Sequence, residues 1–254
     1  MSATPTVGWP LAIALVLLVL VAVAAATAGG LPIRRDVVTA TARAIVQLAV
    51  VSLAIAAVLR SVWWSAGFGL LMFAVATFTS ARRVDAMPDA GWVAVGIAAG
   101  VLPVLAVLFL SGAIPLNGAA LVPTAGIVIG GAMTANTLAG RRAFDELRQQ
   151  IGTYEAALAL GMHRRDAVLE VICPRTPEAL TPVLDQTRTV GLVTLPGAYV
   201  GVLLGGGTAL QAGAAQIMVL VGLVAAEIIT AVVLTRLVAG NLVVPAALRA
   251  RMAA

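Results

Sequence analysis

Stretches of mostly apolar residues, each about as long as a membrane-spanning helix, recur along this chain of 254 residues. About 20 apolar residues in helical form cross the roughly 30 Å hydrocarbon core of a bilayer. The predicted spans cover residues 9–29, 43–59, 64–81, 91–111, 119–140, 188–204 and 213–235. A soluble fold is excluded, because only 11% of the residues are charged, against about 25% in an ordinary soluble domain. The sequence therefore predicts an all-α integral membrane protein with about seven transmembrane helices, folded as a single transmembrane domain over residues 1–254.

The first apolar stretch, LAIALVLLVLVAVAAATAGG, is similar to the core of a secretory signal peptide. A signal peptide begins with a positively charged region, whereas no arginine or lysine precedes this stretch. Its removal would also leave Arg34 and Arg35 outside the cell, contrary to the tendency of positive charges to stay in the cytoplasm. We therefore expect this stretch to be kept as the first span.

Every basic residue is an arginine, and the arginines predict the orientation in the membrane. All but one of them lie in four regions, at residues 34–43, 82–83, 141–188 and 236–251. With seven spans these regions share one side, and the opposite loops hold only Arg60. Because positive residues collect on the cytoplasmic side, we expect the N-terminus outside and the C-terminus in the cytoplasm, in an inner or plasma membrane. Scattered at span ends, the arginines form no basic face for nucleic acid.

The chain lacks the residue clusters that several other functions require. Cys173 is the only cysteine and His163 the only histidine, so neither an internal disulfide nor a four-ligand zinc site can form. A lipid-modifying membrane enzyme would need clustered Asp, His or Arg, and no such cluster occurs. The phosphate loop GxxxxGK(S/T) is also missing, so the chain does not hydrolyse ATP itself. A transporter subunit is favoured over an enzyme, and a channel or an ATPase-binding scaffold stays open.

A hydrophilic insertion at residues 141–187 separates the fifth and sixth predicted spans, on the arginine-rich side. Its first part, up to residue 151, is predicted to continue the preceding helix. Thr153 is expected to cap a short helix, YEAALALG, which Gly161 ends in a left-handed conformation. A second helix, RRDAVLEVI, stops before Pro174, and a third begins at TPEAL with Thr176 as its cap. Short helices joined by sharp turns at a membrane surface are suited to docking a partner.

This insertion resembles the EAA loop of ABC transporter permeases, EAA-x3-G-x9-I-x-L-P. The corresponding residues are Glu155, Ala156, Ala157, Gly161 and Pro174, with identical spacing and with Val171 and Cys173 at the Ile and Leu positions. In that family the loop forms a coupling helix that seats in a groove of a separate ATPase subunit. The residue types suit this role, because small alanines allow close approach and Glu155 offers a charge to a basic partner. The alternative is an ordinary alanine-rich amphipathic helix.

A wider resemblance, over about residues 34–235, is to the FetB-type permeases. It is carried by RAIVQLAV at 43–50, NTLAGRR at 136–142, ALALGMHRRDAV at 157–168, and TVGLVTLPGAYVGVLLGG at 189–206 followed by AQIMVLVGLV. Bacterial members of that family are associated with iron export, and plant relatives with aluminium tolerance and nucleotide-sugar transport. The first span and the tail NLVVPAALRARMAA lie outside the resemblance.

This resemblance implies a metal exporter that works by alternating access. Two copies of the chain would form the pathway in the lipid bilayer, and two ABC ATPase subunits would drive it. ATP and magnesium would bind to the ATPase, and this chain itself would hold no cofactor. An organic or nucleotide-sugar substrate is the alternative, and direction rests on the resemblance alone, because EAA loops are best known from importers.

The LPG segment of the sixth predicted span is one candidate part of the substrate pathway. Proline removes a backbone donor and glycine tolerates unusual dihedrals, so Pro196 and Gly197 are expected to interrupt the helix just before Tyr199. Interrupted helices often mark transport pathways. A harmless kink is the alternative.

Few other polar groups lie inside the predicted spans. Glu227 is an intramembrane carboxylate and therefore a functional candidate, with protonation or pairing with Arg43 as alternatives. Arg43 and Gln47 share a face of the second span, and Asn136 belongs with Thr134 and Thr137 to a polar patch in the fifth. Interhelical hydrogen bonds are the favoured interpretation of both groups.

Ferrous iron prefers carboxylates and imidazoles, and the spans offer one acid and no histidine. The sequence therefore predicts transient ion passage and no tightly bound metal.

Overall fold

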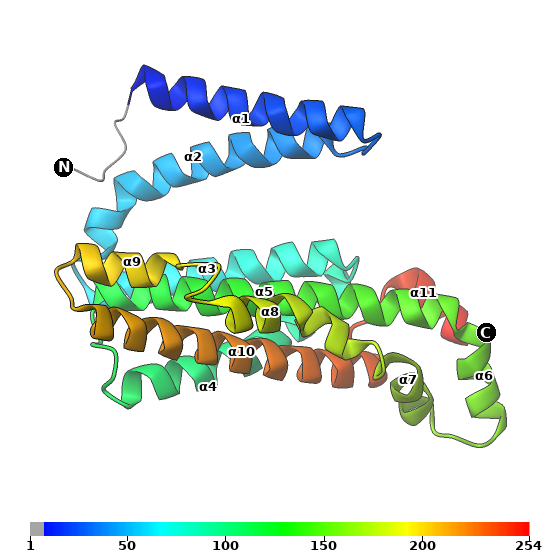
Figure 1. The fold of residues 1–254 in the computed structure, drawn as a ribbon. Helices are drawn as coiled ribbons and strands as arrows, with labels where there is room; N and C mark the ends of the chain where they lie inside the picture. Colours follow the sequence, from blue (N-terminus) through cyan, green and yellow to red (C-terminus); the bar gives the residue numbers. More distant parts are fainter. Residues whose placement is uncertain (1–7, 254) are drawn as a thin grey trace. The chain divides into compact units, whose positions relative to one another are not determined.

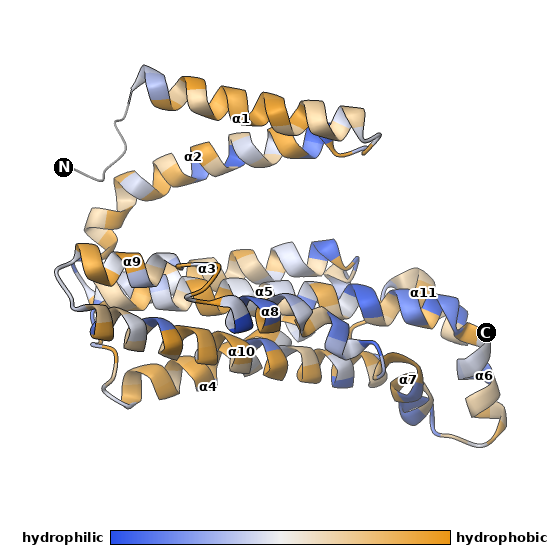
Figure 2. Ribbon diagram, in the orientation of Figure 1, coloured by the Kyte–Doolittle hydropathy of each residue, from blue (hydrophilic) through white to orange (hydrophobic). Residues whose placement is uncertain are grey.

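The computed structural model describes residues 8–253, in which all the regular elements are helices. Six of them are long and apolar enough to cross a membrane: α1 (Trp9–Ala28), α2 (Arg34–Val58), α3 (Val62–Arg83), α4 (Ala90–Leu110), α5 (Gly118–Gln149) and α10 (Ala209–Ala239). Figure 2 shows apolar residues along most of their length. The predicted all-α membrane fold is confirmed. Backbone contacts divide the chain into two compact units, the first ending at Val58 and the second beginning at Leu59; that they act as one transmembrane domain stays a prediction.

The first unit is a hairpin of α1 and α2, which pack against each other (Figure 1). Gly30, at φ 66°, makes the turn between them, and Leu31 N donates to Ala26 O across it at 2.9 Å. In α1 only Ala26 is buried, and in α2 no residue is. The helix α2 begins at Arg34, nine residues before the predicted span, because hydropathy marks only its membrane-embedded part.

The second unit is built around α4, α5 and α10, with α3 packed on α5 (Figure 1). Its buried side chains are mainly small and branched, including Ile97, Val128, Ala226 and Leu234. Helices α4 and α10 approach closely at Gly100, where a Cβ would overlap Thr230 Oγ1 and the Ala226 carbonyl. Small residues at helix contacts are the usual means by which membrane helices pack tightly.

Gly100→Ala is therefore expected to destabilise the second unit by about 1–3 kcal/mol, the usual cost of overpacking a close contact. Gly213→Ala is the matched control, because Gly213 also lies in a long helix but has no heavy atom within 4 Å of the position that an added methyl group would take. Thermal unfolding in detergent should show a lower midpoint for Gly100→Ala alone. Equal midpoints for the two variants would contradict the close contact.

The sixth predicted span, residues 188–204, is not one continuous helix: it holds the end of one short helix, a non-helical segment and a second short helix. Thr176 Oγ1 lies 3.4 Å from Thr235 Oγ1, near the end of α10, whereas Thr208 caps the start of α10. The intervening chain must run back along α10, whose 31 residues at about 1.5 Å each span roughly 45 Å. It does so through α8 (Thr181–Thr189), a non-helical segment at 190–196, and α9 (Gly197–Leu204). The six long helices are broadly consistent with the predicted number of about seven spans.

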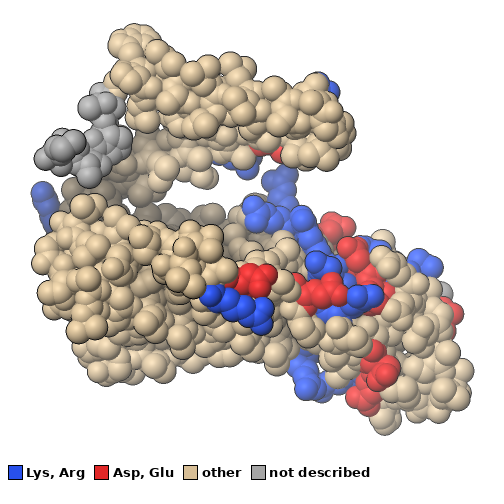
Figure 3. Space-filling model, viewed as in Figure 1, with Lys and Arg blue, Asp and Glu red and all other residues tan. Residues whose placement is uncertain are grey.

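One end of the second unit carries most of its charged residues (Figure 3). Arg141 Nε donates to the Arg83 carbonyl at 3.2 Å, which joins the C-terminal parts of α5 and α3. The C-terminal helix α11 (Ala246–Ala253) docks at the same end, because Asp89 accepts hydrogen bonds from Arg249 Nη2 at 2.7 Å and from Val244 N at 3.2 Å. The tail that the sequence could not assign therefore closes this end of the bundle.

Candidate functional site

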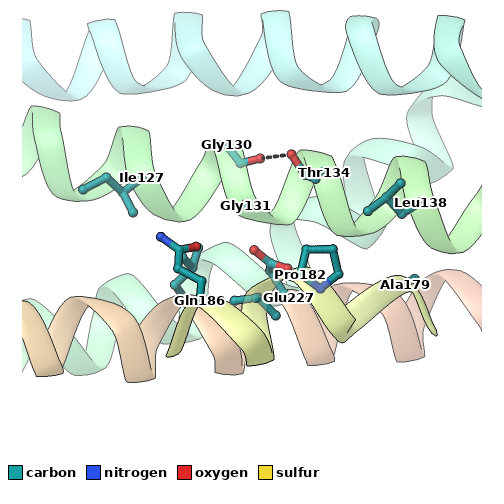
Figure 4. A pocket seen from close by; sticks show the side chains of 11 residues that line it. Ile127, Gly130, Gly131, Thr134, Leu138, Ala179, Pro182, Gln186 and Glu227 are labelled. Atoms are coloured by element: carbon teal, nitrogen blue, oxygen red, sulfur yellow. Dashed lines mark hydrogen bonds between the residues drawn. The ribbon is translucent and has the colours of Figure 1, made fainter. Parts of the chain in front are cut away.

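A cavity of about 240 Å³ lies between α5, α8 and α10. Most of its wall is apolar or small, and its polar groups are Glu227, Gln186 and Thr134. Figure 4 shows the Glu227 carboxylate and the Gln186 amide extending toward the Gly130–Thr134 stretch of α5. A mostly apolar cavity with a few convergent polar groups is the usual form of a small-ligand site.

Glu227 is the only acid that lines this cavity, and its residue surface is 7% exposed. Within the described residues, no hydrogen-bond donor or cation contacts its carboxylate. The backbone of α5 approaches it closely, because a Cβ at Gly131 would lie 2.7 Å from Glu227 Oε1 and would overlap Leu223 Cδ1. A buried charge without a partner is costly. The cavity is therefore the place where a ligand could supply the missing partner.

The other polar groups of the cavity can accept hydrogen bonds. Thr134 Oγ1 donates its own proton to the Gly130 carbonyl at 3.0 Å, so its lone pairs remain able to accept hydrogen bonds. Gln186 contributes an amide from α8. Its charged neighbours on α8, Asp185 and Arg188, pair with each other at 3.1 Å, and both are exposed. No cation of α8 is thus committed to Glu227.

The sixth predicted span is interrupted directly after α8. Gly191 takes a left-handed conformation at φ 82°, and its N–H donates to the Thr194 carbonyl at 2.8 Å. Pro196 then precedes the first residue of α9 in an extended conformation. The expected interruption is present, and it extends from residue 190 to Pro196. Non-helical backbone at membrane depth is tolerated only where protein or water covers it.

Of the residues predicted to contact substrate, Glu227 alone lines the cavity. Pro196, Gly197 and Tyr199 lie at the break and at the start of α9, where Tyr199 is half-buried. Arg43 and Gln47 are both exposed on α2 of the first unit. That any of them contacts a substrate stays a prediction.

Asn136 faces another part of the bundle. It is fully buried, and its Nδ2 donates to Ser80 Oγ of α3 at 3.0 Å. Ser80 Oγ lies 2.9 Å from Thr137 Oγ1, so the three side chains form one network between α3 and α5. The favoured interpretation of Asn136 as an interhelical hydrogen bond agrees with this contact. The patch expected in the fifth span is split, because Thr134 lines the cavity instead.

Two parts of the cavity were not identified from the sequence. Nothing in the sequence indicated that Gly130 and Gly131 line a cavity. Gln186 lies in α8, before the apolar run of the predicted span, and was therefore placed outside the membrane. Gly131 of α5 lies opposite the acid of α10. This relation could have identified it, but it becomes visible only when the packing of the two helices is known.

The predicted coupling segment begins with two short helices, α6 (Ile151–Ala159) and α7 (Arg164–Ile172). Gly161, at φ 88°, makes the left-handed turn that the sequence predicts. The prediction of Thr153 as a cap was wrong, because α5 ends and α6 begins around Gln150, which leaves Thr153 inside the helix. Thr176 likewise lies within a 3-10 helix, η2 (Thr176–Leu180), and Arg175 precedes it.

The surface of α6 and its turn is divided into a packed face and an exposed face. Tyr154 and Ala157 are buried, and so are Val168, Val171 and Ile172 of α7. Glu155, Ala156 and Pro174 are exposed, and Leu160, at the end of α6, is 86% exposed. The exposed residues of this segment therefore include an acid and a large apolar side chain.

Charge pairs hold the end of this segment against α5. Glu178 of η2 contacts Arg175 Nη1 at 2.8 Å and Arg142 Nη1 of α5 at 2.5 Å. The hydrogen bond from Arg175, together with the charges of Arg142 and Arg175, lowers the pKa of the Glu178 carboxyl below its usual value. Arg175 also lies 3.6 Å from Glu146 of α5. The 3-10 helix η2, which connects α7 to α8, is thus held against α5 by both hydrophobic and ionic contacts.

Comparison with known proteins matches residues 9–243 to the Uncharacterised protein family (UPF0014). Three similar proteins are "Protein ALUMINUM SENSITIVE 3" of Arabidopsis thaliana, "UPF0014 membrane protein STAR2" of Oryza sativa subsp. japonica, and "Probable iron export permease protein FetB" of Escherichia coli (strain K12). The first is 31% identical over 82% of this chain and 77% of its own length, and the second 32% over 82% and 74%. The third is 33% identical over 74% of each chain. No solved structure matches the chain.

Proposed function

Because this chain belongs to the Uncharacterised protein family UPF0014, we propose that it is the membrane-spanning permease subunit of an ABC transporter. It exports a metal ion, iron, by alternating access, and a separate ATPase subunit supplies the energy. Iron is taken from the similar protein of Escherichia coli, whose name describes an iron export permease. An ABC permease for an organic or nucleotide-sugar substrate is the alternative.

The observation that carries the proposal is the geometry of the coupling segment. Helices α6 and α7 meet at the left-handed Gly161, and the EAA residues Glu155 and Ala156 are exposed while Ala157 is buried. The buried face of α7 packs against α5 and α10, two of the helices whose residues line the Glu227 cavity. A push on the exposed face of α6 would therefore be transmitted to the helices around the cavity.

The proposed assembly contains two copies of this chain and two copies of the ATPase, in an inner or plasma membrane. ATP and magnesium bind to the ATPase, and this chain holds no cofactor. The arginine-rich end of the second unit, with α6 and α7, faces the cytoplasm, and the N-terminus lies outside. This orientation puts the exposed face of α6 where a cytoplasmic ATPase can reach it.

The test is ATP-dependent movement of radiolabelled ferrous iron into inside-out vesicles that contain this chain and its ATPase. We expect accumulation that requires ATP and that is lost without this chain. The control is a vesicle with the ATPase alone. Iron that does not move, while the chain still stimulates ATP hydrolysis, would reject iron and favour the organic substrate. A chain that neither moves iron nor stimulates hydrolysis would reject the ABC permease itself.

A further inference from the structure

We propose that the Glu227 cavity binds a divalent cation with its shell of water molecules intact, through hydrogen bonds from those waters. The metal would not bond directly to the protein. This inference rests on the proposed function as a metal exporter, and it names the form in which the ion is held.

The first argument is the small number of metal ligands. The part of the chain that the structure describes has no group of three or more His, Cys, Asp or Glu side chains that could hold a metal. In the cavity Glu227 is the sole carboxylate, accompanied by one amide and one hydroxyl. Direct coordination of iron favours imidazole and carboxylate sets. Mg²⁺, in contrast, gives up its waters reluctantly and keeps several of them when one or two carboxylates bind it.

The second argument is space. The cavity measures about 240 Å³, and a water molecule occupies roughly 30 Å³ of liquid volume, so about eight waters would fit. A cation with six waters therefore fits in this volume. The wall on the α5 side includes Gly130 and Gly131, which add no side chain of their own to the space.

The third argument is the character of the polar groups. Waters on a cation donate hydrogen bonds, and the cavity offers acceptors: the two carboxylate oxygens of Glu227, the amide oxygen of Gln186 and the hydroxyl oxygen of Thr134. The positive charge also supplies the partner that Glu227 lacks. Arg188 of α8 and Arg142 of α5 are engaged elsewhere, with Asp185 and Glu178 respectively.

Binding through water predicts a particular selectivity. Direct coordination makes affinity rise from Mn²⁺ through Fe²⁺ to Cu²⁺ in the order common to nitrogen and oxygen sites. A site that contacts only the waters distinguishes ions by charge and hydrated size. We expect Mg²⁺, Mn²⁺, Fe²⁺ and Co²⁺ to bind with affinities within about tenfold of one another, which corresponds to about 1.4 kcal/mol.

The test uses cobalt(III) hexaammine, whose six ammonia ligands do not exchange and which donates hydrogen bonds as a hydrated cation does. The full-length chain in lipid nanodiscs is titrated with Fe²⁺ under anaerobic conditions, with and without this complex. We expect the complex to compete with Fe²⁺. Glu227→Gln should weaken both ions by about tenfold or more, because it removes the charge from charge-assisted hydrogen bonds. Glu170→Gln is the matched control, since Glu170 is an exposed acid outside the cavity.

Gln186→Leu provides a second variant if Glu227→Gln does not fold, and it should weaken both ions several-fold by removing one acceptor. Fe²⁺ binding that the inert complex does not compete for would overturn the inference and indicate direct coordination. Absence of any cation binding to the chain would also overturn it. Because these titrations contain no ATPase, such a failure is distinct from a failure of the permease proposal, which shows as lost stimulation of ATP hydrolysis.

Discussion

Replacement of Glu155 by arginine is expected to reduce stimulation of the partner ATPase by about tenfold or more, while the chain still inserts into the membrane. Glu155 is exposed on α6, and no described residue pairs with it. If the proposed ATPase offers a basic groove to α6, reversal of this charge would replace attraction by repulsion, and like charges juxtaposed at an interface cost several kcal/mol. ATP hydrolysis by the reconstituted pair, measured with each variant, gives the result directly.

Gly161→Pro is expected to have the same effect for a different reason. Gly161 has φ 88°, and its N–H donates to the Leu158 carbonyl at 2.9 Å. Proline fixes φ near −65° and has no N–H, so the turn between α6 and α7 cannot form. Coupling would be lost because the exposed face of α6 would no longer be held at its angle to α7.

Two controls separate coupling from general damage. Gly161→Asn should retain most of the stimulation, because asparagine tolerates the left-handed conformation and keeps the N–H. Glu170→Arg makes the same charge reversal on the exposed side of α7 and should retain it as well. Full stimulation by Glu155→Arg would show that α6 does not dock in the ATPase.

Local chemistry explains which features could be predicted from the sequence. The long apolar helices follow from hydropathy, and α7 occupies the predicted RRDAVLEVI residues. The turn at Gly161 could be predicted because only glycine or asparagine enters the left-handed region readily. Pro196 predicted an interruption because proline cannot donate a backbone hydrogen bond. Each of these features is decided by a few neighbouring residues.

The remaining features depend on contacts between distant residues. Thr134 and Asn136 are two residues apart and so point to opposite sides of α5, but only the packing shows that one meets the cavity and the other Ser80. The contact between Asp89 and Arg249 joins residues 160 positions apart. Gln186 reaches the cavity because α8 folds back along α10. Patterns within a window of residues do not contain these contacts.

Gly131→Ala is expected to remove cation binding at Glu227 and to reduce iron movement by about tenfold or more, which corresponds to about 1.4 kcal/mol. An added methyl group would lie 2.7 Å from Glu227 Oε1 and would overlap Leu223 Cδ1. The carboxylate must then turn away from α5, or α10 must move outward. Overpacking of this kind costs about 1–3 kcal/mol, so stability should fall modestly while the position of the carboxylate changes.

Gly130→Ala is the matched control for this variant. Gly130 is adjacent in the same helix and also lines the cavity, but no heavy atom lies within 4 Å of the position of an added methyl. Replacement of glycine by alanine within a helix favours folding by about 0.5–1 kcal/mol, so this variant should be at least as stable as the wild type and should still move iron. Cation titration and vesicle flux measured on both variants decide the matter. If both variants retain iron flux, the pathway does not pass Glu227. If both lose it, transport is blocked by added volume in the cavity and not by the changed position of the carboxylate.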